Sequence, residues 1–231
     1  MRGCWLARVE QVKKSKGRRV AEIVLAALAI AFVATRLAPE TLIWPYEAKI
    51  GETQIYSEQP ITPEMASVLA RSDVLLRKSE IYSAGYGKRI FLTNGRWRWK
   101  FLSLTLSGAF GHSSGLTEAI VVNRNSIAND LVRNGKAIGG ERKLSSLIAH
   151  ERTHGLIRAH FGRFRSRLFP TWKIEGYSDY IAGQSSLSAA NVAELKRRGE
   201  QHPAMVYYEG RKKVMQALDV DGKTVDELFA Q

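Results

Sequence analysis

Cysteine and proline are scarce in this 231-residue chain, which contains one Cys and six Pro. The single cysteine, Cys4, excludes an internal disulfide framework. Six Pro and 19 Gly without a periodic arrangement exclude a collagen-like or low-complexity chain. Hydrophobic residues make up 45% of the chain and charged residues 25%, which excludes intrinsic disorder as its main description. The length suits one large domain, or a medium-sized domain with an appendage.

Acidic residues are also in deficit, with 22 Asp and Glu against 35 Lys and Arg, for a formal charge of +13. The imbalance excludes an acidic tail protein. The first nineteen residues hold seven cations against Glu10 alone, a net charge of +6 in this short tail. Because almost half of the excess charge lies there, the basicity does not indicate a nucleic-acid partner.

A long apolar run follows the basic tail. Every residue from Ile23 to Ala34 is apolar, and residues 20–38 make a segment of about the 20 residues that a spanning helix needs. Glu22 and Arg36 lie near its two ends, where their side chains can reach the membrane interfaces. Cations on the N-terminal side predict a cytoplasmic N-terminus and an exported remainder, with Cys4 in the reducing compartment.

Two alternatives for this run remain open. A cleaved signal peptide has the same charged and apolar regions, but it requires a small-x-small site, for which residues 35–38 offer a poor match. A buried helix of a soluble core is the other alternative, and the flanking charge cluster disfavours it. We therefore predict a basic cytoplasmic tail (1–19), a transmembrane signal-anchor helix (20–38), a connecting segment (39–61) and one domain (62–231).

Within residues 62–231 the pattern predicts a mixed α+β fold. Thr62, Pro63 and Glu64 are typical of a helix start, and a helix is expected to about Lys78. Apolar residues at helical spacing over 145–162 predict a second helix, with Gly162 as its stop. The other expected elements are strands at Arg89–Asn94 and Leu116–Asn123, and helices from Pro170 and near Ala189–Arg198, Ala204–Leu218 and Val225–Phe229.

Cations and aromatic residues alternate over Arg96–Phe101 (RWRWKF). Such a segment can bind single-stranded nucleic acid or a membrane interface. The period of two more simply predicts a strand with Trp97, Trp99 and Phe101 directed inward.

The predicted helix over 145–162 contains an H-E-x-x-H sequence. His150 and His154 differ by only about 40° around a helix axis and lie about one turn apart. Both imidazoles therefore leave the same face, with a spacing that suits two corners of a tetrahedral Zn²⁺. Glu151 is adjacent and placed to take a proton from water that the metal activates. The bare five-residue pattern also arises by chance, so a third ligand has to be found.

Two residues compete for the third ligand position. His160 completes the metzincin spacing, but Ile157 stands where that pattern has the glycine that breaks the helix. In a continuous helix His160 would face about 240° away from His154. Glu175 lies in the next predicted helix and would give a His₂Glu set. Asp179, four residues later on the same face, could accept the outer N–H of a zinc-bound imidazole. We expect Glu175 rather than His160.

His150, Glu151, His154, Glu175 and Asp179, together with the string W-K-I-E-G-Y-S-D-Y, resemble the gluzincin branch of the zincin metallopeptidases. In that branch a Trp or Leu and then E-G-x-[AS]-x-[YF] commonly follow the H-E-x-x-H helix. EGYSD also resembles the E-x-x-S-D of thermolysin-type enzymes. The matched part covers about residues 116–183, and YYEGRKKVMQAL and TVDELF are more loosely similar to the closing helices of such domains. Arg152 departs from the family, which prefers an uncharged residue there.

The resemblance implies a zincin-like α+β domain with a small mixed sheet, an active-site helix and a helical C-terminal part. It implies peptide hydrolysis at one Zn²⁺, with Glu151 as the general base and a peptide or protein substrate added to an edge strand at Leu116–Asn123. A nearby donor should stabilise the oxyanion, and the phenolic candidates are Tyr177, Tyr180, Tyr207 and Tyr208, of which we select Tyr177 and Tyr207. The alternatives are a catalytically inactive zincin-like scaffold of the cell envelope and a zinc hydrolase with a non-peptide substrate.

Overall fold

The computed structural model describes residues 16–106 and 108–230, and the chain forms two compact units that meet after Ala38. The described part of the first unit is the helix α1 (Lys16–Leu37), in which no residue is buried. Its 22 residues rise about 33 Å, close to the thickness of a bilayer's hydrocarbon core. Within the described residues it is the one helix long and apolar enough to cross a membrane. Residues 1–15 of the predicted basic tail, with Cys4, lie outside the described residues.

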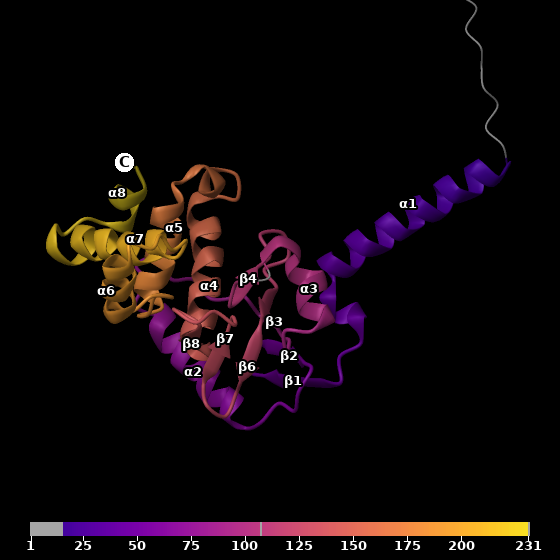
Figure 1. The fold of residues 1–231 in the computed structure, drawn as a ribbon, viewed down its shortest axis with the longest axis horizontal. Helices are drawn as coiled ribbons and strands as arrows, with labels where there is room; N and C mark the ends of the chain where they lie inside the picture. The colour runs from indigo at the N-terminus through magenta and orange to yellow at the C-terminus, as the bar shows by residue number, and fades with distance from the viewer. Residues whose placement is uncertain (1–15, 107, 231) are drawn as a thin grey trace, which may run out of the picture. The chain divides into compact units, whose positions relative to one another are not determined.

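The second unit begins with a five-stranded mixed sheet in the order β1-β2-β3-β5-β4 (Figure 1). The central strands β2, β3 and β5 are parallel, and the outer strands are antiparallel to their neighbours. The strand bounds are β1 (Tyr46–Ile50), β2 (Thr53–Ser57), β3 (Arg89–Leu92), β4 (Gly111–Ser113) and β5 (Ile120–Val122).

Residues 39–61, predicted as a connecting segment, instead contribute part of this sheet. They form the 3₁₀ turn η1 (Pro39–Leu42) and the hairpin of β1 and β2, which turns at Gly51 with a φ of 57°. Residues 53, 55 and 57 of β2 are buried on one face of the sheet, where Ile55 packs in a cluster with residues of the helices α2 (Glu64–Leu76) and α4 (Leu144–Phe161). No element was predicted here because a five-residue alternation is a weak local signal, and the parallel partner of β2 lies about 35 residues away.

The predicted strand over Arg96–Phe101 is wrong, since residues 97–103 form the helix α3 (Trp97–Ser103). Trp99, Leu102 and Ser103 are its buried residues, at the i, i+3, i+4 spacing of a helix, and Trp97 is exposed. The 3₁₀ turn η2 (Leu104–Leu106) follows. Of the strand predicted over residues 116–123, only β5 forms, because Glu118 takes a φ of 55°, which an extended strand cannot contain.

A second, three-stranded antiparallel sheet leads directly into the helix with the H-E-x-x-H sequence. Its strands are β6 (Arg124–Ser126), β7 (Leu131–Arg133) and β8 (Glu141–Lys143), in a region where no helix or strand was predicted. The helix α4 (Leu144–Phe161) starts at the next residue. The Asp130 carboxylate accepts hydrogen bonds from both the backbone N–H and the hydroxyl of Ser145, each at 2.7 Å, and so caps the start of α4.

Helix α4 is the central element of the second unit, and every residue from Leu144 to Thr153 is buried. Figure 1 shows it between the sheets and the group of C-terminal helices. One buried cluster joins the five-stranded sheet, α2 and the first half of α4, and another joins the second half of α4 to α5 and α8. The helices are α2 (Glu64–Leu76), α5 (Thr171–Ile181), α6 (Ala189–Arg198), α7 (Met205–Met215) and α8 (Val225–Ala230), with the 3₁₀ turn η3 (Arg165–Leu168) and the π-helix η4 (Gln216–Val220). The unit is therefore a mixed α+β domain, as predicted.

Candidate metal centre

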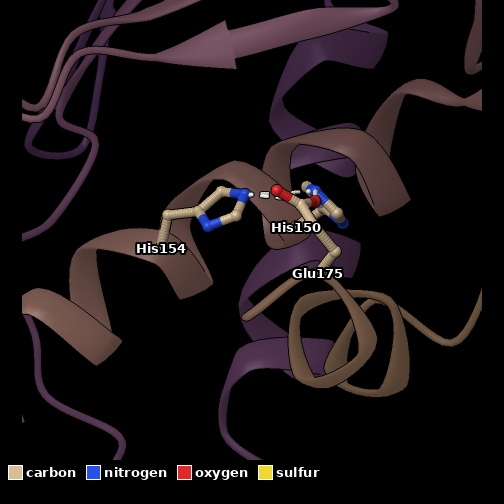
Figure 2. A group of neighbouring side chains, drawn as sticks. All are labelled: His150, His154 and Glu175. Carbon is tan, nitrogen blue, oxygen red and sulfur yellow. Dashed lines mark hydrogen bonds and ion pairs between the residues drawn. The ribbon is translucent and has the colours of Figure 1, made fainter. Parts of the chain in front are cut away.

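The two histidines of H-E-x-x-H lie on one face of α4, as the spacing predicted. The helix is continuous to Phe161 and ends at Gly162, whose φ of 87° is the predicted stop. The Nε2 atoms of His150 and His154 are 3.2 Å apart. Both imidazoles are directed to the same point in space (Figure 2).

Glu175 of α5 completes the group. Its Oε2 lies 3.2 Å from Nε2 of His150 and 3.8 Å from Nε2 of His154. A tetrahedral zinc with bonds of roughly 2.1 Å requires its ligand atoms to be about 3.4 Å apart. The three measured separations are close to this value, so the residues present fit a Zn²⁺ with a fourth position left for another ligand. A His-His-Glu group of this size can bind a metal ion.

Asp179, also on α5, orients the imidazole of His150 through the ring nitrogen that is directed away from Glu175. The Asp179 Oδ1 lies 2.8 Å from Nδ1 of His150 and 3.0 Å from the guanidinium of Arg142 on β8. All three side chains are buried. Because the carboxylate accepts the Nδ1 proton, Nε2 is the atom presented to a metal. The role predicted for Asp179 agrees with this geometry, and Arg142 is an addition that the sequence did not suggest.

The electrostatics of the group follow from burial and from these carboxylates. Burial disfavours a charged His150, but the Asp179 carboxylate outweighs it and raises the pKa of this imidazole to about 9. Burial lowers the pKa of His154. Burial alone would raise the pKa of the Glu175 and Asp179 carboxyls. The imidazoles of His154 and His150 outweigh burial at Glu175 and lower its pKa. At Asp179, Arg142 and His150 outweigh burial and lower the pKa to about 2. Both carboxylates are therefore ionised at neutral pH.

A cleft of about 640 Å³ opens over the group. His150, His154 and Glu175 line it, and so does Glu151, whose carboxylate forms no hydrogen bond with another described residue. The edge strand β4 forms part of the wall. Glu151 is thus available to a molecule in the cleft. The prediction that residues 116–123 supply the open edge is corrected, because β5 is paired on both sides and β4 lies outside it.

The predicted tyrosines separate into one that lines the cleft and others that do not. Tyr207 of α7 lines it, and burial together with the nearby carboxylates raises its pKa to about 12. The selection of Tyr177 as an oxyanion donor is corrected, because its ring is fully buried and its hydroxyl is 2.8 Å from the hydroxyl of Ser79. Tyr180 donates to Asp219 at 2.6 Å, away from the metal ligands. Of the two selected tyrosines, only Tyr207 can reach a molecule in the cleft.

His160 and Arg152 occupy other faces of α4. His160 is 2.7 Å from the Asp226 carboxylate on the exposed side, so its side chain is directed away from the His150-His154-Glu175 group, as the continuous helix predicted. Arg152 is buried, donating to Asp73 at 2.6 Å and to the Thr53 hydroxyl at 3.1 Å. The departure from the family pattern at Arg152 is therefore compatible with close packing, because the charge has a partner on α2.

The close approach of α5 to α7 was also not predicted. A Cβ added at Gly176 would lie 2.5 Å from the carbonyl carbon of Gly210, and one added at Gly210 would lie 2.5 Å from the backbone oxygen of Trp172. The backbones therefore touch beside Glu175. The sequence contains a sign of this contact in the two Glu-Gly pairs of EGYSD and YYEGRKK. Only the packing shows that the two glycines face each other.

Comparison with known proteins gives no relatives. No family model, curated protein or solved structure matches this chain. What supports a function is the chain's own geometry, with two imidazoles and a carboxylate at metal-binding distances, an adjacent free carboxylate and an open cleft.

Proposed function

We propose that this chain is a membrane-anchored zinc metallopeptidase of the gluzincin type, with a zincin-like catalytic domain. The observation that carries the proposal is the His150-His154-Glu175 group, whose three ligand atoms lie within 4.8 Å of one another beside a free Glu151. Two nitrogens and one carboxylate oxygen form a set that zinc uses in catalytic sites with one open position. Glu151 in the same cleft favours an enzyme over a scaffold.

His150, His154 and Glu175 would hold the ion. When bound, Zn²⁺ would act as a Lewis acid toward a carbonyl oxygen and would make water a stronger acid. Glu151 would accept a proton from the attacking water and later donate it to the nitrogen of the leaving amine, which completes the hydrolysis of the peptide bond. Asp179, held by Arg142, would keep His150 in the required tautomer.

Two further groups of the cleft would act on the substrate. Tyr207 carries its phenolic proton at neutral pH, as tyrosine ordinarily does, and the rise of its pKa to about 12 extends this to higher pH. It would therefore donate a hydrogen bond to the developing oxyanion. No described strand pairs with the outer edge of β4. An extended peptide would add to this edge and so pass the metal ligands.

Helix α1 would anchor the domain. Its length and hydropathy suit a single span, and the seven cations of the first nineteen residues favour a cytoplasmic N-terminus. The catalytic domain would then be extracytoplasmic.

The test combines metal analysis with a cleavage assay. The purified full chain is expected to contain one zinc per molecule and to cleave members of a peptide library. Glu151→Gln should keep the metal and lose activity by about 10²- to 10⁴-fold, the usual contribution of a general base. Glu209→Gln, a partly exposed carboxylate on α7, is the matched control and should retain activity. A Glu151→Gln variant with full activity would contradict the mechanism, and zinc binding without any hydrolysis would favour the scaffold.

A further inference from the structure

The connection between α4 and α5 exposes large apolar side chains to solvent. Phe164 is 85% exposed and Leu168 is 84% exposed, and both belong to residues 162–169. Leu116, at 60% exposure, lies beside them, because the Arg163 guanidinium donates to its backbone oxygen at 3.2 Å. Single exposed apolar residues are ordinary, but three on two adjoining segments indicate a contact surface.

The same connection is strongly cationic. Arg163, Arg165 and Arg167 alternate with the apolar residues, and residues 162–169 contain no acid. Arg163 is 3.6 Å from Glu118, whereas Arg165 and Arg167 form no ion pair with any described residue. Apolar side chains that would enter an acyl layer, surrounded by arginines that would meet phosphate, are the pattern of an interfacial membrane contact.

Side-chain contacts place this surface near the start of the second unit. Arg89 bonds to Glu40 at 2.8 Å and to the backbone oxygen of Thr117 at 3.0 Å. The neighbouring Leu116 is the residue that Arg163 holds. Glu40 is three residues beyond the last residue of α1, so the chain itself keeps it within about 11 Å of that helix end. If α1 spans a membrane, this short connection keeps Glu40 close to that end of the span.

We propose that Leu116, Phe164 and Leu168 with Arg163, Arg165 and Arg167 form a docking surface for an anionic lipid bilayer. The charge selects this occupant, since residues 162–169 hold three arginines and no acid and so complement anionic headgroups. The proximity of Glu40 to the membrane-spanning segment supports the same choice. The proposal depends on α1 as a membrane span and is independent of catalysis.

Docking would also bring the cleft to the membrane. Glu118 accepts hydrogen bonds from Arg158, which lines the cleft, and lies near Arg163 of the docking surface. Glu118 therefore connects one arginine of the cleft with one of the docking surface. On the proposed function, the substrates would be peptide segments close to a bilayer surface.

A fluorescence-quenching experiment on the full chain tests the docking. Cys4→Ser removes the natural thiol, and Leu168→Cys supplies a site for an environment-sensitive fluorophore. The protein is placed in nanodiscs of neutral or anionic lipid with brominated acyl chains. We expect a blue shift and strong quenching at position 168 in anionic nanodiscs, and neither at Val74→Cys, an exposed apolar position on α2.

A second set of variants tests whether the arginines contribute to docking. Arg165→Gln with Arg167→Gln should lower the ratio of docked to undocked protein about thirty-fold, since each cation at a membrane surface contributes about 1 kcal/mol. The fluorophore at position 74 and the circular dichroism spectrum should not change, which would show that the variant is folded.

Three results would overturn the proposal. Equal quenching at positions 168 and 74 would show that no docking occurs. Equal quenching at position 168 in neutral and anionic nanodiscs would show that anionic headgroups are not recognised. A blue shift that rises with protein concentration but is insensitive to bromine would assign the surface to a second copy of the chain. None of these readouts depends on zinc or on hydrolysis.

Discussion

Gly176 of α5 and Gly210 of α7 face each other at backbone contact, so that a Cβ at position 176 would lie 2.5 Å from the Gly210 carbonyl carbon. The neighbours of this contact are Glu175, one residue earlier on α5, and Tyr207, one turn earlier on α7. The distance between the two helices therefore controls both a proposed metal ligand and the proposed oxyanion donor.

Gly176→Ala should separate α5 from α7. We expect overpacking to lower the free energy of unfolding by about 1–3 kcal/mol, or roughly 3–10 °C in Tm for a domain of this size. Zinc affinity should fall as well, because Glu175 moves with α5. Thermal unfolding and metal titration measure the two effects. Gly115→Ala is the control, since a Cβ there meets only side-chain atoms at 4.0 Å, and an equal effect of both substitutions would contradict the explanation.

Asp179→Asn should weaken metal binding about 10- to 100-fold, the usual effect of removing a carboxylate that orients a metal-binding histidine. Stability should also fall, because Arg142 would remain buried without a compensating charge. Asp226→Asn changes a similar aspartate–histidine pair on the exposed side of α4 and should leave zinc affinity unchanged. Competition with a chromophoric chelator gives both affinities, and unchanged affinity in Asp179→Asn would exclude the orienting role.

Removal of the metal by a chelator should destabilise the domain. An ion present at a thousand times its dissociation constant contributes about 4 kcal/mol, which corresponds to a Tm difference on the order of 10 °C. His150→Ala and His154→Ala should make the Tm insensitive to the chelator. His160→Ala should keep the full response, since His160 contacts Asp226 rather than the ligand group. A chelator response lost in His160→Ala would revise the ligand set.

Zinc affinity should fall as the pH is lowered. The pKa of His150 is raised to about 9, so near neutral pH its imidazole carries an extra proton that a metal must displace. The pKa of His154 is lowered, so this imidazole is neutral near pH 7 and releases no second proton. Affinity should therefore fall about tenfold for each pH unit between about pH 6 and pH 8. Calorimetry in buffers of different ionisation enthalpy counts the released proton. A pH-independent affinity would contradict the assignment.

Tyr207→Phe should lower kcat by about 10²- to 10³-fold, with little change in KM or zinc content, if the phenol donates to the oxyanion. Tyr177→Phe is the matched control, because that hydroxyl contacts Ser79 in the core. It should lower stability and leave kcat nearly unchanged. Steady-state kinetics of the two variants on one peptide distinguish the roles, and the reverse pattern would refute them.

Short-range patterns predicted much of the candidate site. A spacing of four residues brings His150 and His154 together in any α-helix, and the same spacing relates Glu175 to Asp179. The absence of a helix-breaking residue at position 157 predicted that His160 would face away from the metal ligands. These predictions depend on helix geometry alone, so they required no knowledge of the remaining chain.

Contacts between distant segments account for what the sequence did not reveal. The segment RWRWKF has a strand-like alternation, but Trp99 and Leu102 are buried together because α3 packs on β5. Arg142 reaches Asp179 from β8, in a region where no helix or strand was predicted. The choice of β4 rather than residues 116–123 as the sheet edge depends on strand order, which no local pattern encodes.

The sequence by itself determined the apolar length of α1, the helix that presents His150 and His154 on one face with Glu151 next to His150, and the candidate third ligand. Only the tertiary structure decided that Glu175 comes within 3.2 Å of His150, that Tyr207 rather than Tyr177 lines the cleft, and that Phe164 and Leu168 remain exposed. The physical reason is that periodicity orients side chains about one helix axis, whereas the approach of two helices depends on packing such as that of Gly176 against Gly210.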